Sequence, residues 1–115
     1  MAAFHMPPSN VKTDMVYATE KLRGVDFGFR DAIYITGKLC FASLLKYQAS
    51  LQLALLFQEM GDKKKALMYK NEATKIKKSI IKTFKNKDGM LFASTETSAQ
   101  ADVWATSLAI HFDVL

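Results

Sequence analysis

The chain has 115 residues, half of them hydrophobic, and a formal net charge of +5. A chain of this length holds one small domain, and a mean hydropathy near zero excludes wholesale disorder. Its single cysteine, Cys40, excludes an intramolecular disulfide framework and, within an apolar run, predicts a buried hydrophobe rather than a nucleophile. No run of about 18 consecutive apolar residues occurs and the N-terminus has no basic start, so we expect neither a membrane span nor export.

Residues 1–23 are predicted to form an N-terminal extension that is partly flexible, and residues 24–115 to form one helical segment. Adjacent prolines at positions 7 and 8 favour an extended entry. Scattered apolar residues between positions 11 and 22 suit a short helix that ends near Gly24. The stretch VDFGFRDAIYITGK (residues 25–38) contains two glycines and alternates aromatic with charged side chains, which is typical of an irregular but packed loop.

Residues 39–60, LCFASLLKYQASLQLALLFQEM, predict a long helix that is apolar around most of its circumference. The run contains no Gly or Pro and consists of good or tolerable helix formers. Such a helix needs neighbours on several sides, as in a layered helical assembly. Gly61 is expected to end it, because glycine adopts the left-handed conformation without steric strain, and Asp62 is expected to cap the next helix.

Residues 63–84 predict an amphipathic helix that returns antiparallel to the first, because only one or two residues separate them. Apolar residues recur at intervals of three or four, at Ala66, Tyr69, Ala73, Ile76, Ile80 and Phe84. Ten lysines and no arginine lie between positions 63 and 87. We interpret them as a solvated outer face and expect no nucleic-acid partner, because arginines and exposed aromatic rings are missing from the run.

The C-terminal part of the chain begins with a turn, NKDG (residues 86–89), and a short extended piece, MLFAS. A third helix is predicted within residues 99–115, with Thr95 or Ser98 as its cap. The predicted fold class is therefore all-α, with an antiparallel helical hairpin and a following helix.

These segments together resemble one hairpin and the start of the next in the six-hairpin glycosidases, in particular the α-L-rhamnosidase-like and related bacterial glycoside hydrolases. The resemblance covers residues 24–115 and lies in an acid-aromatic loop, a GD turn, an outer helix with A…Y, a DG turn and a helix that begins with glutamine. The matching residues are Asp26, Phe27, Gly61, Asp62, Ala66, Tyr69, Asp88, Gly89, Gln100 and the run 105–110.

The resemblance implies a segment of an (α/α)6 toroid, with helix 39–60 in the inner ring, helix 63–84 in the outer ring, and a sugar bound at one mouth of the ring. A full toroid has about twelve helices and this chain holds three or four. The implied ring would therefore be completed by the remainder of a parent toroid or by self-association. The implied partner is a carbohydrate, and we do not expect the segment to be active alone.

Asp26 and Asp31 are the predicted catalytic pair, since inverting glycoside hydrolysis uses two carboxyl groups roughly 6.5 to 9.5 Å apart. Phe27 and Phe29 could stack on a sugar face, and Arg30 could hold a hydroxyl or shift the pKa of a neighbouring carboxyl. In the alternative interpretation, Arg30 simply pairs with one aspartate and both phenylalanines belong to the core.

Gln100, Asp102 and Trp104 are further predicted substrate-binding residues, at the start of an inner-type helix. Asp102 could equally be a carboxylate favoured by the helix dipole, with Trp104 in the core. No metal-ligand spacing, phosphate-binding glycine loop or nucleophile elbow occurs, so no cofactor or metal is predicted.

Two other functions remain open at this point. The stretch LFQEMGDKKKALMYKNEA also looks like the turn of a tetratricopeptide repeat, a protein-binding module, although its helices are longer than usual for a 34-residue unit and no second copy appears. The chain could also serve only as an oligomerising helical bundle.

Overall fold

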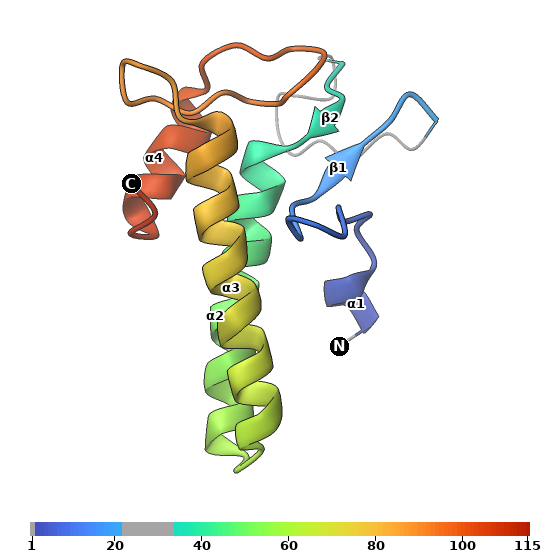
Figure 1. Ribbon diagram of the computed structural model, residues 1–115, viewed down its shortest axis with the longest axis vertical. Coiled ribbons are helices and arrows are strands. Elements are labelled where there is room, and N and C mark those ends of the chain that lie inside the picture. Colours follow the sequence, from blue (N-terminus) through green and yellow to red (C-terminus); the bar gives the residue numbers. More distant parts are fainter. Residues whose placement is uncertain (1, 22–33) are drawn as a thin grey trace.

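A long helical hairpin forms the axis of the protein, which measures 43 × 32 × 25 Å (Figure 1). The computed structural model describes residues 2–21 and 34–115. The elements in chain order are α1 (Ala2–His5), β1 (Tyr17–Ala18), β2 (Gly37–Lys38), α2 (Cys40–Glu59), α3 (Lys63–Phe84) and α4 (Val103–His111).

The hairpin of α2 and α3 confirms the predicted helices and the turn between them. Gly61 has a φ of +77°, the left-handed conformation expected of a glycine that follows a helix. The Asp62 side chain caps α3 by accepting a hydrogen bond from the Lys65 amide at 3.0 Å. That hydrogen bond is the largest of the effects that lower the pKa of the Asp62 carboxyl, with the charges of Lys65 and Lys64 adding to it.

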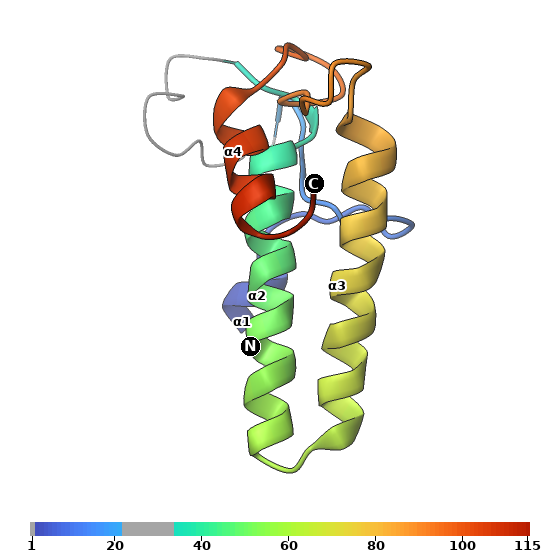
Figure 2. The same ribbon diagram turned by 90° about the vertical axis from the view of Figure 1, so that its left-hand side faces the viewer.

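The main core lies where α2 meets α3 and α4. The predicted apolar stripe of α3 is buried here, with the exception of the half-buried Ala66, and Cys40 is buried as expected. Figure 2 shows α4 beside the upper part of α2, and both helices begin at the same end of the molecule. The core cluster is made of Met15, Cys40, Leu44, Tyr47, Ala73, Ile76, Ile80, Phe84, Leu91, Ala105, Ala109 and Val114.

The surface of α2 is covered unevenly. Most of its first half is covered by α3, α4 and the N-terminal residues, although Leu45 is 46% exposed, whereas Leu55 and Leu56, in its second half, are 62% and 53% exposed. The nine residues of α4 cannot reach along the twenty residues of α2, because each helical residue advances only about 1.5 Å. The enclosure predicted for α2 is therefore greatest near its start within this chain.

By length and composition alone, α2 could also cross a membrane, with 39% of its most apolar window buried inside the protein. A single helix of this kind is a weak indication of a span, because core helices have the same length and composition. Here α2 packs against α3 and carries Lys46 in an ion pair with Glu72. The expectation of no membrane partner stays a prediction.

A small sheet modifies the predicted all-α class, although the chain is mainly helical. β1 and β2 pair antiparallel, with Tyr17 opposite Lys38 and Ala18 opposite Gly37. The short helix expected in residues 11–24 is wrong for its described part, since residues 11–13 form a turn and β1 follows. Asp14 has a φ of +56°, which is incompatible with a continuous helix at that point.

The start of α4 also differs from the prediction. The capping residue is Asp102, whose Oδ1 accepts from the amides of Trp104 at 3.0 Å and Ala105 at 3.1 Å. Neither Thr95 nor Ser98 caps the helix, because both lie in a bend and turn, and the bridge of Ala101 to Phe92 separates them from the first turn of α4. The extended piece predicted after the NKDG turn is present as the bridges of Leu91, Phe92 and Ser94.

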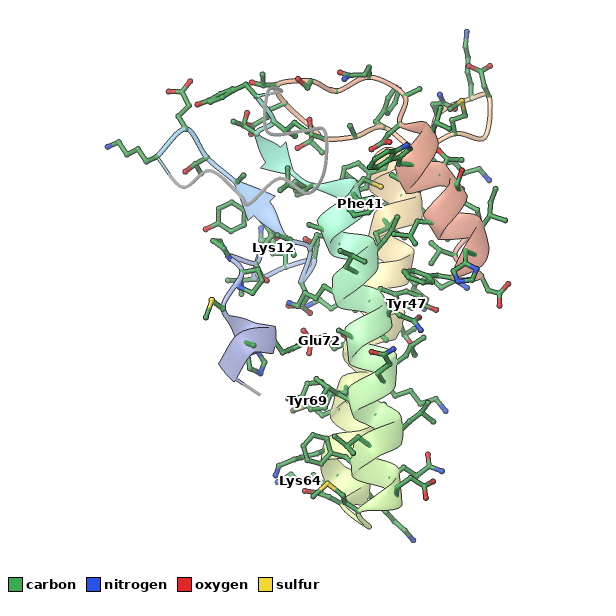
Figure 3. The ribbon with its side chains drawn as sticks, turned by 180° about the vertical axis from the view of Figure 1, so that it is seen from behind. Lys12, Phe41, Tyr47, Lys64, Tyr69 and Glu72 are labelled. Atoms are coloured by element: carbon green, nitrogen blue, oxygen red, sulfur yellow. The ribbon has the colours of Figure 1, made fainter. Side chains whose placement is uncertain are left out.

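Two tyrosines on the hairpin predict a decline in stability above pH 10. Burial raises the pKa of Tyr69 and of Tyr47, helped by the negative charges of Glu72 and Asp113 respectively. Figure 3 shows Tyr69 and Glu72 on the flank of the hairpin that faces α1. The neutral tyrosines contribute fully to the free energy of unfolding below their unfolded-state pKa of about 10. This contribution is lost as the pH rises through their higher folded-state pKa.

We expect the urea midpoint of the native protein to be lower at pH 11 than at pH 9. In the Tyr69→Phe variant this decrease should be smaller. The phenylalanine keeps the ring that stacks on Phe57 at 5.6 Å but has no proton to lose. Circular dichroism at the two pH values measures both midpoints. An identical fall in the native protein and the variant would contradict the prediction, because lysine titration affects both chains equally.

Candidate functional site

A pocket of about 870 Å³ lies at the end of the hairpin where α2 and α4 begin. Three segments that are distant in sequence form it: β1 with the residues after it, β2 with Thr36 before it, and the loop 94–98. Figure 1 shows β1, β2 and the loop between α3 and α4 gathered at this upper end. The lining residues are Asn10, Tyr17, Ala18, Thr19, Glu20, Lys21, Thr36, Gly37, Lys38, Thr95, Glu96 and Thr97.

The loop 94–98, with the sequence Ser-Thr-Glu-Thr-Ser, is held by its four hydroxyl groups. Thr95 Oγ1 accepts from the Lys38 amide at 2.9 Å, and Thr97 Oγ1 lies 3.0 Å from Thr36 Oγ1. Ser98 Oγ donates to the Tyr34 carbonyl at 2.7 Å. The fourth hydroxyl, of Ser94, donates to the Thr97 carbonyl at 2.6 Å, so every residue of the loop except Glu96 is tied by its side chain.

Gly37 allows this loop to approach β2 closely. A Cβ atom at position 37 would lie 2.5 Å from Thr95 Oγ1 and 2.9 Å from Glu96 Cγ, and real Cβ atoms do not approach other atoms so closely. The φ of +86° at Gly37 also favours glycine. The absence of a side chain at position 37 therefore sets where the stem of Glu96 lies at the edge of the pocket.

The charges around the pocket balance. Two carboxylates, Glu20 and Glu96, and two ammonium groups, Lys21 and Lys38, line it, together with the ring of Tyr17. Four threonines and one asparagine add hydroxyl and amide groups. A concave surface with hydrogen-bonding groups of both kinds and one aromatic ring suits a polar ligand without net charge.

The predicted catalytic pair, Asp26 and Asp31, lies outside the described residues. The same holds for Phe27, Phe29 and Arg30, the predicted substrate-binding residues of that loop. Of the described residues that flank this segment, Lys21 lines the pocket and Tyr34 accepts the hydrogen bond from Ser98.

The other predicted binding residues lie in the short segment that follows the loop 94–98 and at the start of α4. Gln100 is exposed, and its carbonyl accepts from the Ala93 amide at 2.8 Å. Asp102 is 7% exposed, and its side chain stabilises the start of α4 as the N-cap. Trp104 is 44% exposed, so it does not belong to the core of this chain, and its surface is accessible to a ligand.

A second pocket, of about 700 Å³, lies along the hairpin beside the N-terminal segment. Lys46 is 8% exposed there, and its ammonium group forms an ion pair with Glu72 at 3.1 Å. The same group donates to Ser9 Oγ at 3.0 Å and to the Asp14 carbonyl at 3.1 Å. Asp14 in turn pairs with Lys75 at 2.7 Å, so the charged groups here fasten the N-terminal segment to the hairpin.

No group of three or more histidine, cysteine, aspartate or glutamate residues that could hold a metal ion occurs in residues 2–21 and 34–115. Within the same residues, both charged clusters consist of carboxylates paired with or offset by lysines.

Comparison of the sequence with models of known protein families finds no match, and a search of curated proteins finds none either.

Proposed function

We propose that this chain is a segment of the helical toroid of a carbohydrate-active enzyme of the inverting glycoside hydrolase type, and that it contributes sugar-contacting loops at one mouth of the ring. The observation that supports the proposal is the arrangement of α2, α3 and α4. α2 and α4 start at the same end and pack side by side, whereas α3 runs the opposite way. An inner helix, its outer partner and the next inner helix of a toroid have this order and these directions.

The distribution of apolar and charged surface supports the same assignment. Seven of the eight lysines of α3 are exposed and the eighth, Lys77, is half-buried, which suits an outer-ring helix. Large apolar residues are exposed on the second half of α2 and on α4, namely Leu55, Leu56, Val103, Trp104 and Ile110, and α3 also exposes Leu67 and Met68. Exposed apolar surface of this kind is what further inner-ring helices, from a parent toroid or from other copies, would cover.

The tetratricopeptide alternative fits the observed hairpin less well. α2 and α3 span 20 and 22 residues, and together with their turn they run from residue 40 to residue 84. This is longer than the 34-residue unit of that repeat. The greater lengths favour a toroid hairpin.

Affinity electrophoresis of the 115-residue chain through gels that contain soluble polysaccharides tests the proposal. We expect at least one of starch, xyloglucan, galactomannan and rhamnogalacturonan to retard the folded protein, and no retardation after heat denaturation. A protein that migrates through all four at its rate in a plain gel would contradict the proposal.

Trp104 provides a matched pair of variants for the same gels. Trp104→Ala removes an accessible ring whose face can pack on the C–H groups of a sugar, so we expect retardation to weaken at least threefold. Ile110→Ala removes an apolar residue of similar exposure from the other end of α4 and should leave retardation unchanged. Equal retardation of the Trp104→Ala and Ile110→Ala variants would show that Trp104 does not contact the polysaccharide.

A further inference from the structure

We infer that the pocket between β1, β2 and the loop 94–98 binds an uncharged saccharide, and that Glu96 accepts hydrogen bonds from its hydroxyl groups. This inference rests on the proposed function and names the binding site and the class of ligand. None of its residues is among the sugar contacts expected from the sequence in residues 26–31 and 100–104. It therefore adds a third contact region to the proposed mouth of the ring.

The way the loop presents Glu96 is the first argument. The two threonines and two serines around Glu96 are all tied by their hydroxyl groups, and Gly37 lets β2 lie directly against the Glu96 stem. Within the described residues no hydrogen bond or ion pair engages the Glu96 carboxylate, which is exposed at the pocket. A loop fixed at every position except its one carboxylate holds that group ready for a ligand, because little conformational freedom is lost on binding.

The composition of the lining is the second argument, since it selects the class of ligand. A carboxylate accepts two hydrogen bonds from neighbouring hydroxyls, and such charge-assisted bonds are stronger than neutral ones. Lys38 carries an ammonium donor, the hydroxyls of Thr95 and Thr97 accept hydrogen bonds within the protein and keep their own protons to donate, and Tyr17 belongs to the same lining. A saccharide offers vicinal hydroxyls, ring oxygens and C–H faces, which match these three kinds of group.

The charge balance disfavours ligands that carry a net charge of one sign. A phosphate or a polyanion would meet the carboxylates of Glu20 and Glu96, and nearby like charges are unfavourable. A multivalent cation would meet the ammonium groups of Lys21 and Lys38. The volume of about 870 Å³ falls within the range of about 300 to 1,000 Å³ that is typical of small-molecule sites.

Backbone amide NMR of the 115-residue chain tests the inference with maltohexaose, cellohexaose and xylohexaose as uncharged probes and tetragalacturonate as a charged one. We expect at least one uncharged probe to shift the amides of Gly37, Lys38, Thr95, Glu96 and Thr97. In Glu96→Gln the dissociation constant of that probe should rise about tenfold or more, because a hydrogen bond to a charged group is replaced by a neutral one. Glu59→Gln, an exposed carboxylate at the far end of α2, is the control and should bind as the native chain does.

Each other result has a definite meaning. Shifts confined to residues 102–104 would overturn this pocket and leave the proposed function standing. Stronger binding of tetragalacturonate than of the uncharged probes would overturn the class of ligand. Unchanged affinity in Glu96→Gln would overturn the role of Glu96, and no shift with any probe, together with no retardation in polysaccharide gels, would overturn both proposals.

Discussion

Replacing Lys46 with methionine is expected to lower the free energy of unfolding by about 3 kcal/mol. Methionine keeps the apolar stem but removes the ammonium group that joins Glu72, Ser9 and the Asp14 carbonyl. Glu72 is mostly buried and would lose its ion-pair partner, which is more harmful than the absence of both charges. The loss is measured by urea unfolding followed by circular dichroism.

The control for Lys46 is Lys65→Met, which breaks the exposed pair of Lys65 with Asp62 at 3.3 Å. That change should lower the free energy of unfolding by less than about 1 kcal/mol, because exposed ion pairs contribute little. The double variant Lys46→Met, Glu72→Met should recover at least half of the loss caused by Lys46→Met alone. If Lys46→Met were no more harmful than Lys65→Met, the buried network would not fasten the N-terminal segment as described.

Replacing Gly37 with alanine is expected to lower the free energy of unfolding by about 3 kcal/mol. About 1 kcal/mol of this comes from an alanine held at positive φ. The remainder comes from the clash of the new Cβ with Thr95 Oγ1 and the stem of Glu96, since overpacking typically destabilises by about 1 to 3 kcal/mol.

Gly89→Ala separates the two causes. Gly89 has a φ of +83°, close to that of Gly37, but a Cβ there would meet nothing within 4 Å. This variant should therefore lose only about 1 kcal/mol in the same urea experiment. Equal losses for Gly37→Ala and Gly89→Ala would show that the loop 94–98 does not lie tightly against β2.

The two long helices could be predicted from the sequence because the signals that define them are local. The three-to-four spacing of Ile76, Ile80 and Phe84 specifies one buried face, and Gly61 with Asp62 specifies the turn within two residues. The solvated lysines of α3 follow from the same spacing. Each of these features depends on residues that are close together in the chain.

The sheet and the cap of α4 could not be predicted in the same way. β1 is too short to show the alternation of apolar and polar residues that is typical of a strand. Its partner β2 lies about twenty residues away, so the pairing depends on contacts that no short stretch of sequence contains. The apolar residues Met15 and Val16 are part of a spacing that suits a helix. Both are buried in the core, but the positive φ of Asp14 turns the chain just before them. Asp102, rather than Ser98, caps α4 because Ser98 lies in a turn with a φ of +62° and the bridge of Phe92 to Ala101 separates it from the helix.

The pocket cannot be predicted from the sequence alone, because it is formed by three segments that are far apart in the chain. Tyr17, Lys38 and Glu96 have no common spacing that a motif could describe. Two signals were present in the sequence: the run of hydroxyl residues on both sides of Glu96, and a glycine before Lys38 that could mark close backbone approach. Neither signal points to a ligand until the fold places them side by side.

The turn at Gly61 is the natural place to attach a reporter group to this protein. It lies at the opposite tip of the hairpin from the pocket, separated by the twenty residues of α2, or about 30 Å. A Cβ at Gly61 would meet nothing within 4 Å, so an inserted peptide tag or a fluorophore there has room to extend into solvent. Surface immobilisation through this tip would leave the opposite end unobstructed.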